Sequence, residues 1–145
     1  MNNMKLGTFF MTFMGFYILV MGLLMIFVTE IMFISDFGEY TGQTYATYYA
    51  TSQVFAEIFI LQKKVMGFMI CGIGVSVLFI VKKGFSVGEK WAWYVLLITG
   101  CLVWGTFIGY KILIMYYGGS MITFVVGLIL LILGLVFPCK DILKK

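Results

Sequence analysis

The sequence predicts an all-α protein: a four-transmembrane-helix bundle in the cell membrane, with both termini in the cytoplasm. The 145 residues are 63% hydrophobic and 11% charged, with a mean hydropathy of +1.09. Soluble domains are about half apolar and a quarter charged. The apolar residues gather in four runs, each about the length that crosses ~30 Å of hydrocarbon. The cationic side chains, all lysine, lie mostly at the ends of those runs.

The four runs belong to one integral membrane domain, residues 1–145. The predicted spans cover about residues 6–30, 54–81, 91–115 and 120–137. The first is longer than a usual signal-peptide apolar region and lacks a small-x-small cleavage site, so we expect it to be retained. Aromatic residues flank the third span at both ends, which is typical of a spanning helix. The fourth ends at Pro138, which cannot continue a helix.

The connections have distinct compositions. Residues 31–53 form the longest loop, and its second half carries Tyr45, Tyr48 and Tyr49. Tyrosine favours the headgroup level, so we expect a short interfacial helix before the second span. Residues 82–90 form a polar loop rich in lysine and glycine.

Lysine asymmetry sets the orientation. With four spans, the N-terminus, the 82–90 loop and the C-terminus share one side, which carries most of the lysines, whereas most acidic residues lie on the other. The positive-inside rule places the lysine-rich side in the cytoplasm and the tyrosine-rich loop outside.

Composition also excludes several chemistries. There is no histidine, which removes histidine-ligated haem, most zinc and copper sites, and histidine acid/base catalysis. Cys71, Cys101 and Cys139 form no C-x-x-C pair. No phosphate loop or nucleophile elbow occurs. We therefore expect no cofactor, no metal site, no catalytic set and no nucleic-acid partner, since the lysines mark membrane ends.

Glycines indicate how the helices pack. They recur seven residues apart in three spans, and the third span contains a G-x-x-x-G pair. Two turns separate residues seven apart, so each pair lies on one helix face. Small residues let helix backbones approach closely in lipid. The predicted packing positions are Gly15, Gly22, Gly67, Gly74, Gly105, Gly109, Gly127 and Gly134.

One group of charged residues is a candidate polar site. Under this topology its members fall near the outer ends of their helices: Glu30, Glu57, Lys63, Lys64 and Lys111. Glu57 and Lys64 lie within about 20° on one helix face. The group either lines a pocket at the outer mouth of the bundle or consists of structural ion pairs and anchors that snorkel to headgroups.

The stretch G-E-K-W-A-W-Y at residues 88–94 carries a family resemblance. It is similar to a short basic loop followed by a tryptophan-rich helix start in small prokaryotic four-helix membrane families, including DoxX-like ones. The order of spans and loops also resembles theirs. The resemblance implies the four-helix fold. DoxX-like proteins have been linked to terminal oxidase or redox partners, but no residue role carries over to this chain.

The sequence favours a non-enzymatic accessory or assembly partner of a membrane complex. Its extramembrane parts are small and its packing faces are abundant. The expected partners are the lipid bilayer and either another membrane protein or further copies of the chain. Two alternatives stay open: a small oligomeric transporter or channel with a polar crevice at Glu57 and Lys64, and a membrane enzyme acting on a lipid or quinone.

Overall fold

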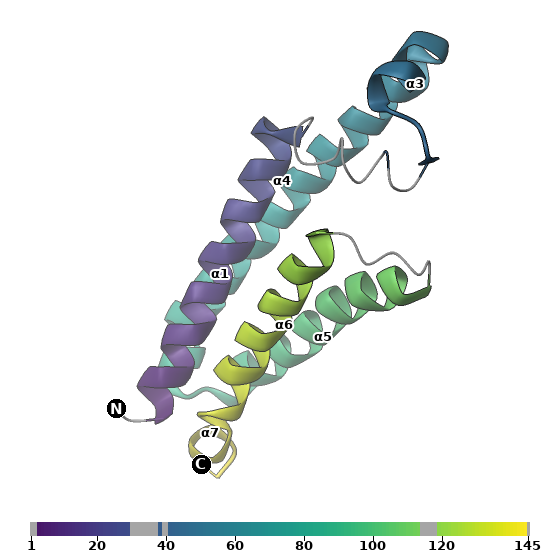
Figure 1. Cartoon of the computed structure of the whole chain (residues 1–145). Coiled ribbons are helices and arrows are strands. Elements are labelled where there is room, and N and C mark those ends of the chain that lie inside the picture. Colours follow the sequence, from purple (N-terminus) through teal and green to yellow (C-terminus); the bar gives the residue numbers. More distant parts are fainter. Residues whose placement is uncertain (1–2, 30–37, 39–40, 114–118, 145) are drawn as a thin grey trace.

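The computed structural model describes residues 3–29, 38, 41–113 and 119–144, and this part of the chain is helical with no β-strand. The elements are α1 (Asn3–Phe27), α3 (Tyr45–Thr51), α4 (Gln53–Lys83), η1 (Phe85–Val87), α5 (Lys90–Leu113), α6 (Gly119–Val136) and α7 (Cys139–Leu143) (Figure 1). The predicted all-α class is confirmed. Among the described residues, α1, α4 and α5 are long and apolar enough to cross a membrane, and α6 is a shorter apolar helix.

Helix boundaries differ from the predicted ones by a few residues at either end of the helices. α1 begins at Asn3 and α4 ends at Lys83, beyond the predicted limits at residues 6 and 81. α1 ends at Phe27, before the predicted limit at residue 30. α3 stands where the tyrosine-rich segment predicts a short helix. The Thr44 side chain caps α3 by accepting from the Thr47 amide, the role for which threonine is favoured at this position. α4 then continues without a break to Lys83.

Helix α1 is the central element because it packs against both α4 and α6. Its contact with α4 depends on glycine. A Cβ atom added to Gly22 would lie 2.8 Å from the Gly67 carbonyl oxygen, and one added to Gly74 would lie 2.8 Å from the Leu19 nitrogen. Gly15 meets the Leu78 side chain in the same way. The backbones of α1 and α4 therefore approach too closely for larger residues at these positions.

Larger side chains fill the other contacts. The Met11 side chain of α1 covers Gly134 of α6, and the Trp104 ring of α5 covers Gly127 of α6. Two hydrogen bonds reinforce these contacts. The Tyr17 hydroxyl donates to the Thr123 carbonyl oxygen at 2.9 Å, and Trp93 Nε1 donates to the Leu135 carbonyl oxygen at 3.1 Å.

Two predicted packing glycines have no partner within the described part of the chain. A Cβ atom added to Gly105 or Gly109 would meet no atom within 4 Å. The expected packing role of the G-x-x-x-G pair is therefore not seen there. α5 instead packs through Gly100, which is buried against Leu131 of α6.

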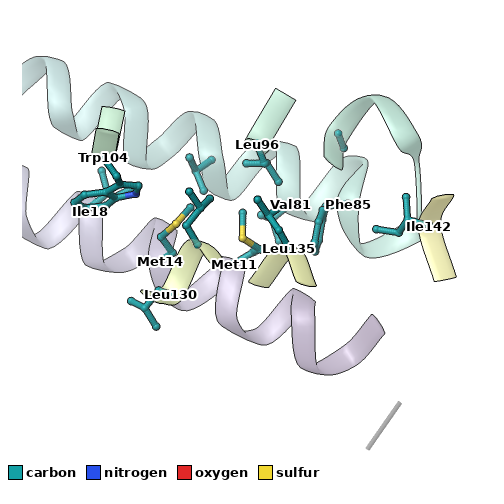
Figure 2. Packing of buried hydrophobic residues seen from close by; sticks show 13 residues of the cluster. Met11, Met14, Ile18, Val81, Phe85, Leu96, Trp104, Leu130, Leu135 and Ile142 are labelled. Carbon is teal, nitrogen blue, oxygen red and sulfur yellow. The ribbon is translucent and has the colours of Figure 1, made fainter. Parts of the chain in front are cut away.

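The segment between α4 and α5 is more ordered than the predicted polar loop. η1 turns Phe85 into the interior, where its side chain is 0% exposed. Gly88 then has a φ of 82°, in the left-handed region that favours glycine. At the end of the chain, α7 buries Ile142. Figure 2 shows Phe85 close to Met11, Val81 and Leu135, so this end of the molecule holds a closely packed part of the core.

Contacts between helices show which residues lie at the same depth. Gly15 meets Leu78, and Gly22 meets Cys71, so α1 and α4 run antiparallel and Phe27 lies level with Met66. The corresponding contacts of α6 with α1 and α5 also show antiparallel pairs. Thr123, near the start of α6, is held level with Tyr17 by their hydrogen bond, so α1 continues past the start of α6. Figure 1 shows α1 extending beyond the neighbouring ends of α5 and α6, and α4 and α3 continuing beyond the end of α1.

Candidate functional site

Glu57, the acidic member of the predicted site within the described residues, lies in an exposed network at the start of α4. Its Oε1 atom accepts hydrogen bonds from Gln53 Nε2 at 2.9 Å and from the Tyr49 hydroxyl at 3.2 Å. Tyr49 belongs to α3, and the Tyr45 hydroxyl also donates to the Ala56 carbonyl oxygen at 3.3 Å. These bonds hold α3 against the first turns of α4.

The lysines of the predicted site differ in their environments. Lys63 is half-buried, and its Nζ lies 5.3 Å from the centroid of the Phe59 ring, a distance at which a cation and an aromatic face attract. It precedes Gly67 by one turn and lies on the same side of α4. Lys64 is exposed. Lys111 is half-buried in the last turn of α5, seven residues after the buried Trp104 and therefore on the same face.

The structure separates Glu57 from the lysines of its own helix. At 1.5 Å per residue, Glu57 lies about 10 Å along the axis from Lys64, although both occupy one face. Lys63 and Lys111, in contrast, are both half-buried. Lys63 lies just past the end of α1, and Lys111 lies in the last turn of α5. Glu30, the remaining predicted member, lies outside the described residues.

The interior holds a small apolar crevice between α1, α4 and α5. Its lining residues are Met14, Ile18, Ile73, Val77, Leu96, Thr99, Gly100, Val103 and Trp104. The Thr99 hydroxyl, which could have faced a ligand, donates to the Val95 carbonyl oxygen at 2.6 Å. The crevice volume is about 20 Å³, whereas a cavity that holds benzene measures about 150 Å³. It accommodates no ring-sized cofactor as it stands.

A larger hollow lies where α1 begins, at the end of the bundle away from Glu57 and Lys63. Its volume is about 400 Å³, and it is lined by Met4, Lys5, Thr8, Phe9, Thr12 and Ser86. The Thr12 hydroxyl donates to the Thr8 carbonyl oxygen, and the Ser86 hydroxyl donates to the Lys82 carbonyl oxygen. Both hydroxyls are therefore used as donors to backbone carbonyl oxygens, and Lys5 is the charged residue of the lining.

Sequence reasoning missed this hollow because Thr8 and Thr12 stand inside an apolar run and Ser86 stands in a different segment. Residues eight and twelve lie one turn apart, which is a usable signal for a shared face. The contribution of Ser86 depends on the fold of η1.

The described residues contain no cluster of three or more histidine, cysteine, aspartate or glutamate side chains that would hold a metal ion. Each fully enclosed side-chain nitrogen or oxygen among them has a hydrogen-bond partner. The interior is thus satisfied by its own contacts.

Compared with known proteins, the chain matches no family model, no curated protein and no solved structure. Its function has to be inferred from its own residues.

Proposed function

We propose that α1, α4, α5 and α6 all cross the cell membrane as a four-span bundle with both termini in the cytoplasm. The antiparallel packing of α1 against α4 and of α6 against α1 and α5 supports this topology. α6 has 18 residues, about 27 Å of helix, which approaches the ~30 Å thickness of a hydrocarbon core. Most lysines lie at the end of the bundle that holds both termini, and the positive-inside rule favours a cytoplasmic location for that end.

Within this topology the protein acts as a non-enzymatic accessory or assembly partner of a membrane complex. The observation that carries this function is the bare glycine face of α5, which we define as Ile98, Leu102, Gly105, Gly109 and Ile112. The three large residues are 57%, 64% and 52% exposed, and the glycines meet nothing within 4 Å in the described chain. Such a face is suited to close packing with a helix of another protein.

The two alternatives receive less support from the geometry. A transport crevice at Glu57 and Lys64 would require groups that converge, but these lie about 10 Å apart along an exposed helix face. A membrane enzyme acting on a quinone would require room for a ring, but the crevice between α1, α4 and α5 measures about 20 Å³. One acting on a lipid would require catalytic groups, but the hollow at the start of α1 has no carboxylate or thiol among its lining residues.

Site-specific photocrosslinking in native membranes tests the accessory function. A photoreactive amino acid at Ile98 or Ile112 should give a discrete heavier adduct with another membrane protein, identified by mass spectrometry. The matched control is Phe13 of α1, which is also exposed and carries no glycine beside it on its face. Protein adducts that appear equally at Phe13, or lipid adducts alone at the α5 positions, would count against the proposal.

A further inference from the structure

Helix α4 is longer than the helices around it. Its 31 residues measure about 46 Å. Because Met66 lies level with Phe27 at the end of α1, residues 53–65 extend about 20 Å past that end. This projecting part of α4 is continuous with the membrane-crossing part, so it cannot turn flat onto the membrane surface.

One face of α4 is apolar and exposed over its whole length. We call it the outward stripe, and it consists of Val54, Ile58, Leu61, Val65, Phe68, Gly72, Val75 and Phe79. Its seven large residues are between 43% and 68% exposed, and Gly72 meets nothing within 4 Å. The intervals between successive members alternate between four and three residues, which is the heptad period of a helix–helix contact.

The opposite side of α4, which packs against α3 near its start and against α1 from Gly67 onward, has the same spacing. Its members each stand two positions after a member of the outward stripe: Ala56, Ile60, Lys63, Gly67, Ile70, Gly74, Val77 and Val81. All of these are buried or half-buried. Two positions correspond to about 200° around a helix, so α4 has an occupied contact face and an unoccupied one on nearly opposite sides.

Lipid can cover only part of the outward stripe. α1 has a comparable exposed stripe, from Phe9 to Phe27, but it spans about 27 Å of helix, which the hydrocarbon core can cover. The stripe of α4 continues for about 20 Å beyond the end of α1, through Val54, Ile58 and Leu61. α3 is held beside Ala56 and Glu57, to one side of the stripe, and these three residues stay 43–68% exposed. An exposed apolar face of this kind marks an interaction surface.

We propose that the outward stripe binds the outward stripe of a second copy of the chain, forming a parallel α4–α4 dimer. Two copies inserted in the same orientation present α4 in parallel. In heptad terms Ile58 and Val65 occupy a positions and Leu61 occupies a d position, the arrangement that favours two parallel strands. A partner of the same chain therefore fits both the direction and the residue types of the stripe.

The residues beside the stripe are compatible with this pairing. Gly72 lies on the stripe within the membrane-crossing part, where it lets the two backbones approach. Glu57 and Lys64 occupy the g positions, and the e positions they would face in a parallel pair hold Gln62 and Met69, so no like charges meet. In this dimer Glu57 and Lys64 lie along the edge of the contact between the two α4 helices. The proposal requires only that α4 crosses the membrane and is independent of the α5 glycine face.

Disulfide crosslinking in native membranes tests the dimer, in a background whose native cysteines have been replaced. Val54→Cys and Leu61→Cys place thiols on the stripe. Gln53→Cys is the matched control, because Gln53 is exposed, adjacent to Val54, and about 100° away around the helix. Oxidation should give several-fold more two-chain adduct at Val54 and Leu61 than at Gln53. Equal adduct at all three positions, or adduct with a different protein, would overturn the proposal.

A second measurement uses the unmodified chain in nanodiscs, where mass photometry or native mass spectrometry should detect two copies of the 16.5 kDa chain. The variant Ile58→Glu with Leu61→Glu should reduce the two-copy fraction several-fold while retaining the helical circular dichroism of the parent. A single copy of the unmodified chain under conditions that preserve its fold would contradict the dimer.

Discussion

At the scale of single residues, the contact between α1 and α4 leaves no room for a side chain at Gly22. A Cβ atom there would lie 2.6 Å from Cys71 Sγ and 2.8 Å from both the Cys71 nitrogen and the Gly67 oxygen. Two of these three atoms belong to the backbone, so a side-chain rotation cannot relieve the clash. The helices themselves would have to separate.

We therefore expect Gly22→Ala to lower the free energy of unfolding by about 1–3 kcal/mol, the usual cost of overpacking. Thermal unfolding in a mild detergent, followed by circular dichroism, measures the change. Gly105→Ala is the control because the added methyl group meets nothing in the described chain, and its stability should stay unchanged or rise by up to about 1 kcal/mol from helix propensity. Equal losses in both variants would show that the close contact is not the cause.

At the scale of elements, the sequence predicts the long helices and the short helix α3 well, and the turn between α4 and α5 poorly. Apolar runs of about 20 residues have few alternatives to a helix, because a membrane leaves no partner for unpaired backbone groups. The segment at residues 82–90 has no such constraint. Its single buried aromatic residue, Phe85, stands among lysines and glycines without any period, so the sequence contains no signal that it joins the core.

The candidate site shows a different limit of sequence reasoning. Glu57 and Lys64 share a helix face, and a projection down the helix axis places them together. That projection discards the rise of 1.5 Å per residue, which separates them by about 10 Å. The inward positions of Lys63 and Lys111 depend on how α4 and α5 pack, which the individual helix sequences do not specify.

The turn after η1 provides a test at this scale. Gly88 has a φ of 82°, which costs a residue with a Cβ atom about 1–2 kcal/mol. Gly88→Ala should therefore lower the thermal unfolding temperature, whereas Ser86→Ala, at an exposed position of the same turn, should leave it nearly unchanged. Similar unfolding temperatures for Gly88→Ala and the unmodified chain would show that the turn relaxes without cost.

At the scale of the whole molecule, the proposed topology separates two sets of exposed positions. Cysteines introduced at Ser86 and at Thr41, in a background without native cysteines, should react with a membrane-impermeant thiol reagent on opposite sides. In intact cells Thr41→Cys should be labelled and Ser86→Cys should be protected, and permeabilised cells should label both. Labelling of Ser86→Cys in intact cells would reverse the assigned orientation.

The contact between α1 and α6 joins the first helix of the chain to the last long one, and this affects the order in which the molecule is assembled during synthesis. α1 and α4 can pair once residues up to Lys83 have left the ribosome. The Tyr17 hydroxyl, however, obtains its acceptor only when Thr123 has been made and inserted. Until then a polar group of α1 lacks its final partner in an apolar setting, which is unfavourable. The contact between α1 and α6 therefore forms only after α6 has been translated and inserted.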